Sequence, residues 1–301
     1  MTPGNLVAVG AALLLGASAC AAGADAGSGS SVVASLYPPA FAAERVAGPS
    51  TDVIDLTPAG AEAHDIELSL EQRSAIEEAD LVLYLGDLGF QPQVEAAVED
   101  ASGTVIDLTG SLELLEGHPD EHAEEEGTEV PVDPHVWLDP VRFSEMVDGI
   151  TAALAEVDRD PADDLEGRAD ALLGELASLD EEYRSSLEGC ETHTMVVSHE
   201  AFGYLADRYG LEQVGLAGTT PEAEPTVQAL GEAGELLSSG QAHAVFYEAD
   251  AESKRIAESV AGDFDLPALP LGTLESQPVG GDYLSVMADN LDSLRRGLGC
   301  E

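Results

Sequence analysis

Three histidines in separate phrases are the residues of this 301-residue chain best suited to chemistry. His64 lies in PAGAEAHDIELS, His135 in DPHVWLDP and His199 in VVSHEAFGYLADRYGL. Neutral imidazole is the commonest borderline-soft metal ligand in proteins, and three imidazoles suit Zn²⁺ better than Ca²⁺ or Mg²⁺. Because the three are far apart along the chain, they can bind one ion only if the fold brings them together.

Each histidine is expected where a strand ends and a helix begins. His64 follows a predicted strand at Val53–Leu56, and His199 directly follows another at Thr194–Ser198. His135 precedes a predicted helix. In α/β sheets this position is the rim of the crevice in which ligands bind. Each histidine alone could be a helix cap, but together they predict a metal site.

The three phrases, in this order, resemble those of the periplasmic metal-binding proteins of zinc and manganese ABC importers, the ZnuA/TroA-like solute-binding family. The resemblance covers most of the chain. It implies two Rossmann-like βα lobes joined by one long linking helix, with the metal in the cleft between them. It also implies a receptor that captures Zn²⁺ outside the membrane and delivers it to the membrane permease of an ABC importer.

The residue pattern predicts an α/β fold with mostly parallel sheets, because short β-branched runs alternate with helical stretches. The predicted strands are Val32–Leu36, Val53–Leu56, Leu81–Leu85, Thr104–Leu108, Thr194–Ser198, Leu211–Leu216, Ala244–Tyr247 and a short one near Leu269. The predicted helices are Leu70–Ala79, Pro140–Val157, Pro161–Leu187, Ala201–Tyr209, Pro225–Ser239, Glu252–Ala261 and Asp282–Leu298.

In Pro161–Leu187 apolar residues recur every three or four positions without a strand signal, which predicts one long helix. This helix lies near the middle of the chain and divides it into two halves. A helical link between lobes is stiff, so we expect small rocking motions rather than wide closure. The expected divisions are a lipoprotein-type signal peptide (1–20), a flexible tether (21–31), an N-terminal metal-binding lobe (32–158), the linking helix (159–189) and a C-terminal metal-binding lobe (190–301).

The resemblance implies a fourth ligand, a carboxylate or a water, from the loop before the last helix of the C-terminal lobe. That loop reads LGTLESQPVGGDYLSVM, and Glu275 is its best-placed carboxylate. Glu248, Asp282 and water remain alternatives. Manganese proteins of the family tend to replace the third histidine with an acid, so the retained His199 favours zinc. A receptor specific for Mn²⁺ or Fe²⁺ is the alternative.

A zinc metalloenzyme is the competing function from a different class. The HExxH motif of zinc proteases is absent, because Glu200 is followed by Ala-Phe-Gly, and no GxSxG or GxGxxG motif occurs. We therefore expect a binding protein and not an enzyme. Cell adhesion, a label attached to this family, is compatible with metal binding, but no repeat or adhesive motif supports it here.

Four further side chains have expected places around the site. His193 and His243 lie outside the three family phrases and are expected to be surface or capping residues. Trp137 and Tyr204 are expected to pack beside the metal and to exclude water.

The charge of the chain is strongly acidic, with 59 Asp and Glu against 11 Lys and Arg and a net charge of −48. Such a chain should be repelled by nucleic acid and by anionic lipid. A solvated surface suited to a salty habitat is a better interpretation than a field that attracts divalent cations, since the acids are spread along the chain. In the acidic loop 116–129, His118 and His122 are either secondary metal-capture groups or part of a solvated acidic run.

The cysteines indicate export. The apolar run at 6–19 is too short to span a bilayer, and the following LGASAC resembles a lipoprotein cleavage site at Cys20. A lipid on Cys20 would anchor a monomer to the outer face of the cytoplasmic membrane; the alternative is an ordinary secretory signal. Cys190 and Cys300 then remain, and an oxidising compartment favours one disulfide between them over two free thiols.

Overall fold

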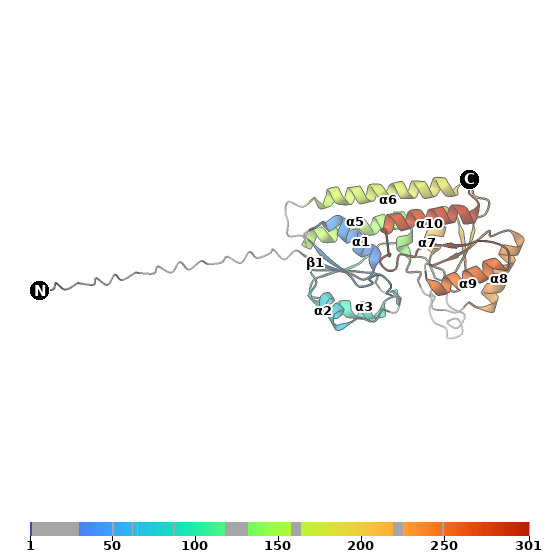
Figure 1. Cartoon of the computed structure of the whole chain (residues 1–301). Helices are drawn as coiled ribbons and strands as arrows, with labels where there is room; N and C mark the ends of the chain where they lie inside the picture. Colours follow the sequence, from blue (N-terminus) through green and yellow to red (C-terminus); the bar gives the residue numbers. More distant parts are fainter. Residues whose placement is uncertain are drawn as a thin grey trace.

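Two α/β lobes lie side by side in the computed structural model, and one long helix, α6 (Leu165–Leu187), runs along both of them (Figure 1). The structure describes residues 1, 30–49, 51–61, 63–64, 66–86, 88–117, 132–157, 164–218, 225–248 and 250–300. Residues 2–29, which include Cys20 and most of the predicted signal peptide and tether, lie outside this range, as do His118 and His122.

The N-terminal lobe has a four-stranded parallel sheet in the order β2-β1-β3-β4. Its strands are β1 (Ser31–Ala34), β2 (Asp52–Asp55), β3 (Leu81–Tyr84) and β4 (Thr104–Asp107). Its helices are α1 (Tyr37–Ala47), α2 (Leu70–Glu78), α3 (Pro92–Ala97) and α5 (Pro140–Val157), with single 3₁₀ turns η1 (Val98–Asp100) and η2 (Val136–Leu138).

The C-terminal lobe repeats the same topology, with the parallel order β6-β5-β7-β8. Its strands are β5 (Thr194–Val197), β6 (Glu212–Gly215), β7 (Val245–Tyr247) and β8 (Ala268–Pro270). Its helices are α7 (Gly203–Tyr209), α8 (Val227–Ser239), α9 (Ala251–Gly262) and α10 (Tyr283–Leu298). Since the strands of each sheet run parallel, the loops after them gather at one edge of that sheet.

The predicted α/β class with parallel sheets is confirmed. Several predicted strands end one residue too late, because the apolar pattern continues past the strand end: Leu56 is completely buried and Leu85 is 1% exposed, although each follows the last residue of its strand. Helix α2 begins with a capping box, since Ser69 and Gln72 each accept a hydrogen bond from the other's backbone N–H.

Helices α1 and α3 were not predicted. Nine of the eleven residues of α1 are buried, so no polar face gives the sequence a helical period. Helix α3 has only six residues, too few for a period to be visible.

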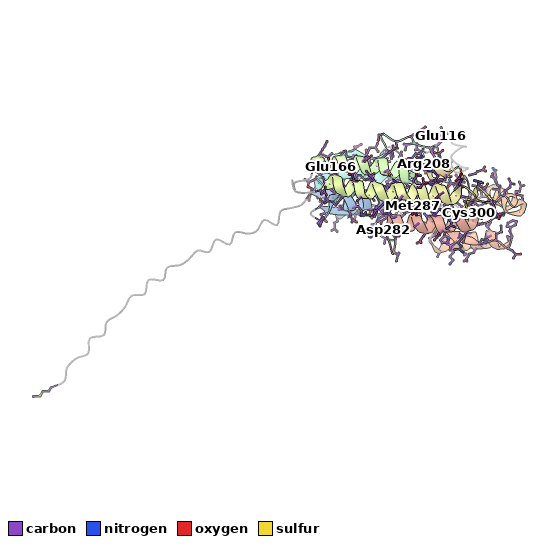
Figure 2. The ribbon with its side chains drawn as sticks, turned by 90° about the horizontal axis from the view of Figure 1, so that it is seen from above. Glu116, Glu166, Arg208, Asp282, Met287 and Cys300 are labelled. Carbon is purple, nitrogen blue, oxygen red and sulfur yellow. A yellow bond between two sulfur atoms is a disulfide. The ribbon has the colours of Figure 1, made fainter. Side chains whose placement is uncertain are left out.

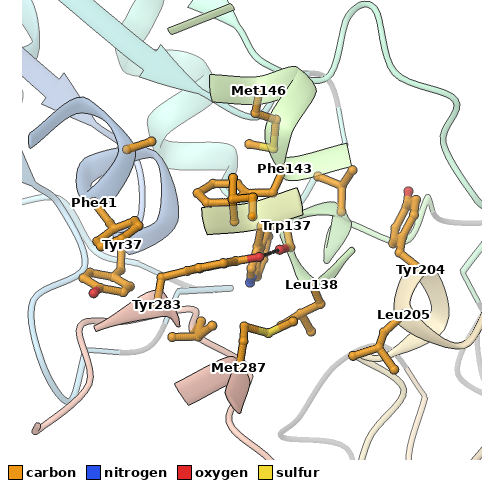
Figure 3. Close-up of a cluster of buried hydrophobic side chains, with 14 of the residues drawn as sticks. Tyr37, Phe41, Trp137, Leu138, Phe143, Met146, Tyr204, Leu205, Tyr283 and Met287 are labelled. Carbon is orange, nitrogen blue, oxygen red and sulfur yellow. Dashed lines mark hydrogen bonds between the residues drawn. The ribbon is translucent and has the colours of Figure 1, made fainter. Parts of the chain in front are cut away.

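One hydrophobic core extends across both lobes and includes side chains of α1, α5, α6 and α10. Tyr283, at the start of α10, stacks on Phe143 of α5 with ring centroids 4.3 Å apart, and its hydroxyl donates to the carbonyl oxygen of Trp137 at 2.7 Å (Figure 3). The Tyr183 hydroxyl of α6 donates to the Met287 carbonyl of α10 at 2.6 Å. The last helix of the chain therefore joins the lobes as much as the linking helix does.

The long helix buries one stripe of side chains, as its spacing predicts, and Figure 2 shows it lying across both lobes. The buried residues are Ala169, Leu172, Leu176, Leu179, Tyr183 and Leu187. The helix begins after Asp164, whose side chain accepts a hydrogen bond from the Gly167 N–H. The domain boundaries given above stay predictions.

A buried ion pair also joins the lobes. Asp139, which precedes α5 and is fully buried, accepts hydrogen bonds from Arg208 of α7, the shortest at 2.7 Å, and from Arg142 at 2.8 Å. Its Oδ1 also accepts from the Val141 N–H at 2.9 Å, so it caps α5.

Cys190, just before β5, and Cys300, just after α10, are joined by a disulfide that closes the C-terminal lobe. Among the described residues, no helix combines the length and apolar character needed to cross a membrane.

Candidate metal centre

Four side chains from the two lobes converge between the sheets. His64, His135, His199 and Glu275 each offer one ligand atom, and these atoms all lie within 4.8 Å of one another. The fold therefore brings together the three predicted histidines and the leading candidate for the fourth position. That they bind a metal stays a prediction.

His64 lies in the loop between β2 and α2. The Gln91 side-chain amide supports this loop, donating to the carbonyl oxygens of Ala63 at 3.2 Å and Ser35 at 3.1 Å. The Phe90 ring meets the imidazole edge-on at 4.6 Å. The His64 side chain is 11% exposed, which makes it the most exposed of the four.

His135 lies in the segment between β4 and α5 and is completely buried. Asp133 Oδ1 lies 2.8 Å from its Nδ1 and also accepts from its backbone N–H at 2.9 Å. A carboxylate at one ring nitrogen fixes the ring and leaves the other nitrogen for a metal. That nitrogen, Nε2, lies 3.2 Å from Glu275 Oε1, and Trp137 packs beside the ring with centroids 5.4 Å apart.

His199 follows β5 after one residue, as predicted, and is 1% exposed. Its Nδ1 contacts Glu248 Oε1, so a carboxylate again lies behind the ring. Its buried Nε2 faces Glu275 at 3.8 Å and makes no hydrogen bond to any described residue. A buried polar atom without a hydrogen bond is costly, and a bound cation at the centre would satisfy it.

Glu275 lies in the loop between β8 and α10, and its neighbour Leu274 adopts a left-handed conformation with φ of 60°. A bulky side chain rarely adopts this conformation unless its surroundings impose it. The N-terminal lobe makes contacts on both sides of Leu274 that hold this conformation. Trp137 Nε1 donates to the Thr273 carbonyl at 2.7 Å, and the Thr57 hydroxyl donates to the Glu275 carbonyl at 3.0 Å.

The metal-free centre is held by charged hydrogen bonds. Burial lowers the pKa of His135, but its hydrogen bonds to Asp133 and Glu275 outweigh burial and raise the pKa to about 10. For Glu275, burial raises the pKa, but hydrogen bonds from His135 and His64 bring it well below its usual range. Without a bound ion, a proton on His135 would supply the positive charge that faces these carboxylates.

The geometry fits a tetrahedral ion. Ligands at Zn²⁺ bond lengths lie ~3.3 Å from one another in a tetrahedral site. Glu275 oxygens lie 3.2 Å from His135 Nε2, 3.6 Å from His64 Nε2 and 3.8 Å from His199 Nε2. Small side-chain movements would bring all four groups to zinc distances. Three nitrogens and one oxygen suit Zn²⁺ better than Mn²⁺, which prefers oxygen ligands.

The other acids considered for the fourth position have different roles. Asp282 is the N-cap of α10, and its side chain accepts from the Ser285 N–H at 2.9 Å. Glu248 lies behind His199 and does not belong to the four gathered groups.

Two predicted non-ligands are indeed outside the centre. His193 is exposed, and the nearest carboxylate to His243 is that of Glu191 at 3.7 Å. Tyr204 has a more specific role than predicted: its hydroxyl donates to the Asp133 carbonyl at 2.8 Å and so supports the segment that carries His135.

Three supporting residues were not predicted: Asp133, Gln91 and Thr57. Asp133 precedes His135 by two residues in DPHVWLDP, and an Asp-x-His spacing could have indicated a carboxylate behind the ring. No local signal identifies Gln91 or Thr57, because their partners are far away in the sequence.

An open groove of about 600 Å³ lies beside the centre. Glu275 lines it together with Glu248, Asp250 and Gly60 of the His64 loop, so its wall carries three carboxylates.

Comparisons with known proteins show the family to which the chain belongs. The family model of ZnuA, described as the periplasmic zinc-uptake complex component A, matches residues 32–297. The high-affinity zinc uptake system protein ZnuA of Bacillus subtilis is 30% identical over 278 residues, which cover 89% of this chain and 87% of that protein. The family predicted from the three histidine phrases is thus confirmed.

The zinc-binding protein AdcA of Streptococcus pyogenes is 31% identical over 284 residues, covering 88% of this chain but only 55% of AdcA. The chain therefore spans about half the length of the AdcA relatives it matches.

Solved structures are similar along nearly the whole chain. The Zn(II)-bound ZnuA-like domain of Streptococcus pneumoniae AdcA matches with a TM-score of 0.73 and 29% identity, covering 89% of this chain and 98% of the domain. The laminin-binding protein Lmb of Streptococcus agalactiae, described as an adhesin with metal-transporting activity, matches with a TM-score of 0.76 and 30% identity, covering 90% of this chain and 100% of Lmb.

Proposed function

The chain belongs to the ZnuA family of periplasmic zinc-uptake components, and from this premise we propose that it captures Zn²⁺ outside the cytoplasmic membrane and delivers it to the permease of an ABC importer. The observation that carries the proposal is the convergence of His64, His135, His199 and Glu275, with ligand atoms within 4.8 Å of one another. We propose these four as the zinc ligands.

The ligand set suits a cargo that must be bound tightly and later released. Two ligands come from each lobe, so the bound ion joins the lobes and a partner could detect it by their relative position. Zinc needs deprotonated imidazoles, so binding would displace the proton from His135. Asp133 and Glu248, behind two of the rings, would then stabilise the metal-bound form.

Location and partners belong to the proposal. We propose that Cys20 carries a lipid that holds a monomeric receptor at the outer face of the membrane, beside its permease. His118 and His122, in the acidic loop, would supply weak secondary metal capture. The family is one of transport components, and we propose that this chain binds metal without catalysing a reaction.

The proposal is tested with two matched variants of the full chain. Glu275→Gln removes the ligand charge, whereas Asp282→Asn changes a nearby acid and keeps a good helix cap. We expect elemental analysis to find zinc, and anomalous scattering to place it among the four groups. Glu275→Gln should weaken zinc binding in calorimetry, and Asp282→Asn should not. Manganese in place of zinc, or equal affinities for both variants and the unaltered protein, would overturn the proposal.

A further inference from the structure

A three-residue sequence, Asp-Leu-Thr, occurs twice in the N-terminal lobe, once at the end of β2 and once at the end of β4. In the first copy the Thr57 N–H and hydroxyl lie 2.8 and 3.1 Å from Asp55 Oδ1. In the second, the same groups of Thr109 lie 2.9 and 2.7 Å from Asp107 Oδ1. The two copies therefore form the same local turn.

The two threonines differ in what else they contact. The Thr57 hydroxyl also lies 3.0 Å from the Glu275 carbonyl oxygen, 218 residues away, and the Thr57 carbonyl accepts from the Gln277 N–H at 3.4 Å. The Thr109 hydroxyl instead lies 3.5 Å from the carbonyl of Gly86, in its own lobe. Both threonines are buried, so neither hydroxyl can readily exchange its protein partner for bulk water.

The contact from Thr57 falls on a strained part of the chain. Leu274 has φ of 60°, and the carbonyl on its other side, that of Thr273, accepts from Trp137 Nε1 at 2.7 Å. Thr57 and Trp137 both belong to the N-terminal lobe. The opposite lobe therefore holds the chain on both sides of Leu274, at the Thr273–Leu274 peptide and at the Glu275–Ser276 peptide. Such outside contacts are what keeps an unfavourable backbone conformation in place.

We propose that Thr57 is a positioning residue that holds Glu275 in its place from across the lobe boundary. The inference rests on the proposed function, because it takes Glu275 as a ligand. Glu275 belongs to the C-terminal lobe by sequence, yet its backbone is fixed by the N-terminal lobe. A rocking movement of the lobes that breaks the bonds from Thr57 and Trp137 frees Leu274 from its left-handed conformation and withdraws Glu275 from the ion. Zinc release is thereby tied to lobe movement.

The repeated turn supplies the control for the test. Thr57→Val and Thr109→Val each remove one hydroxyl from the same kind of turn, and Thr57→Ser keeps the hydroxyl. Zinc dissociation from the full, loaded chain is followed by competition with a chelator. We expect Thr57→Val to bind zinc about tenfold more weakly, through faster dissociation, a loss typical of groups that orient metal ligands. Thr57→Ser and Thr109→Val should dissociate like the unaltered protein.

A purely structural role would give a different pattern. In that case Thr57→Val and Thr109→Val would lower the melting temperature of the metal-free protein alike and leave zinc dissociation unchanged, which would overturn the inference. An equal loss of zinc affinity in both variants would overturn it too. If Thr57→Val does not fold, Trp137→Phe can be used instead, because it removes the other hydrogen-bond donor to the Glu275 loop. Unchanged zinc dissociation in that variant would refute the positioning of Glu275 from the opposite lobe.

A double variant separates this inference from the proposed function. If Thr57 acts through Glu275, Thr57→Val should cause no further loss in a Glu275→Gln background, whereas an additive loss would exclude that route. If Glu275→Gln binds zinc as tightly as the unaltered protein, the ligand assignment itself fails. If Glu275→Gln weakens binding and Thr57→Val does not, only the positioning role fails.

Discussion

The two lobes share one strand order but bring their ligands to the site from different loops. In the N-terminal lobe the ligands follow the second and fourth strands, as His64 and His135. In the C-terminal lobe they follow the first and fourth strands, as His199 and Glu275. A parallel sheet gathers all its loops at one edge, so one topology can supply a site from different strands. The loop after the fourth strand is the feature that both lobes use.

Each lobe holds one of its two ligands more firmly than the other. His135 and His199 are at most 1% exposed and each has a carboxylate behind the ring, whereas the His64 side chain is 11% exposed and rests against Phe90. Glu275 is held by the opposite lobe. The site therefore has two histidines that a carboxylate orients, one from each lobe, whereas His64 and Glu275 are positioned by other contacts.

The largest expected effect concerns the C-terminal lobe, since the N-terminal residues 30–157 contain no cysteine. The disulfide joins Cys190 to Cys300 across 110 residues, and closing so long a loop stabilises a fold by about 4 kcal/mol. Replacing both cysteines with alanine should lower the free energy of unfolding in urea by about that amount, while zinc affinity stays the same. An unchanged unfolding curve would mean that the thiols are free.

Removal of a ligand should reduce zinc affinity by different amounts at the two N-terminal histidines. His135→Ala should reduce zinc affinity by about a hundredfold, because it removes a buried ligand and leaves Asp133 without its ring partner. His64→Ala should cost less, since water can enter at the more exposed position. Calorimetry on both variants measures the difference, and equal losses would show that burial does not distinguish the two ligands.

The carboxylates behind the rings provide a finer comparison between the lobes. Asp133→Asn and Glu248→Gln should each weaken zinc binding by about tenfold, the lower end of the range for groups that orient metal ligands. The loss should be greater for Asp133, which is 3% exposed and holds both Nδ1 and the backbone N–H of His135. Chelator competition measures both affinities, and a greater loss of zinc affinity in Glu248→Gln than in Asp133→Asn would contradict the prediction.

The last comparison concerns pH dependence. The pKa of His135 is raised from 6.5 to about 10, so the protonated ring stabilises the metal-free fold below pH 6.5, and this contribution is lost as the pH rises through 10. Glu275, whose pKa is lowered, contributes above its ordinary pKa of 4.5 and loses that contribution on acidification.

Zinc binding depends on the protonation of His135 in the opposite direction from fold stability, because zinc binds only the deprotonated ring. Zinc affinity should therefore rise with pH, by at most about tenfold per unit for one displaced proton. Calorimetry in buffers of different ionisation enthalpy should detect a proton released on zinc binding at pH 7. No proton release would contradict a protonated His135 in the metal-free protein.

Much of the architecture could be predicted from local pattern. The alternation of β-branched runs with helical periods gave the parallel α/β class, and the buried stripe of α6 follows the three- and four-residue spacing of its apolar residues. Helix α1 could not be found in this way, because it is buried on nearly all sides and has no polar face to create a period.

The three histidines could be identified from the sequence because imidazoles are scarce in it, seven in all, and three of them lie in distinctive phrases. The roles of the acids could be identified only in part, because 59 carboxylates are chemically alike until the fold supplies their neighbours. The family resemblance indicated Glu275 as the leading fourth ligand but left Glu248 and Asp282 as alternatives. Only the tertiary structure sets Glu275 toward the three rings, Glu248 behind His199 and Asp282 at a helix cap. Periodicity and capping are local properties, whereas the role of a buried carboxylate depends on groups hundreds of residues away.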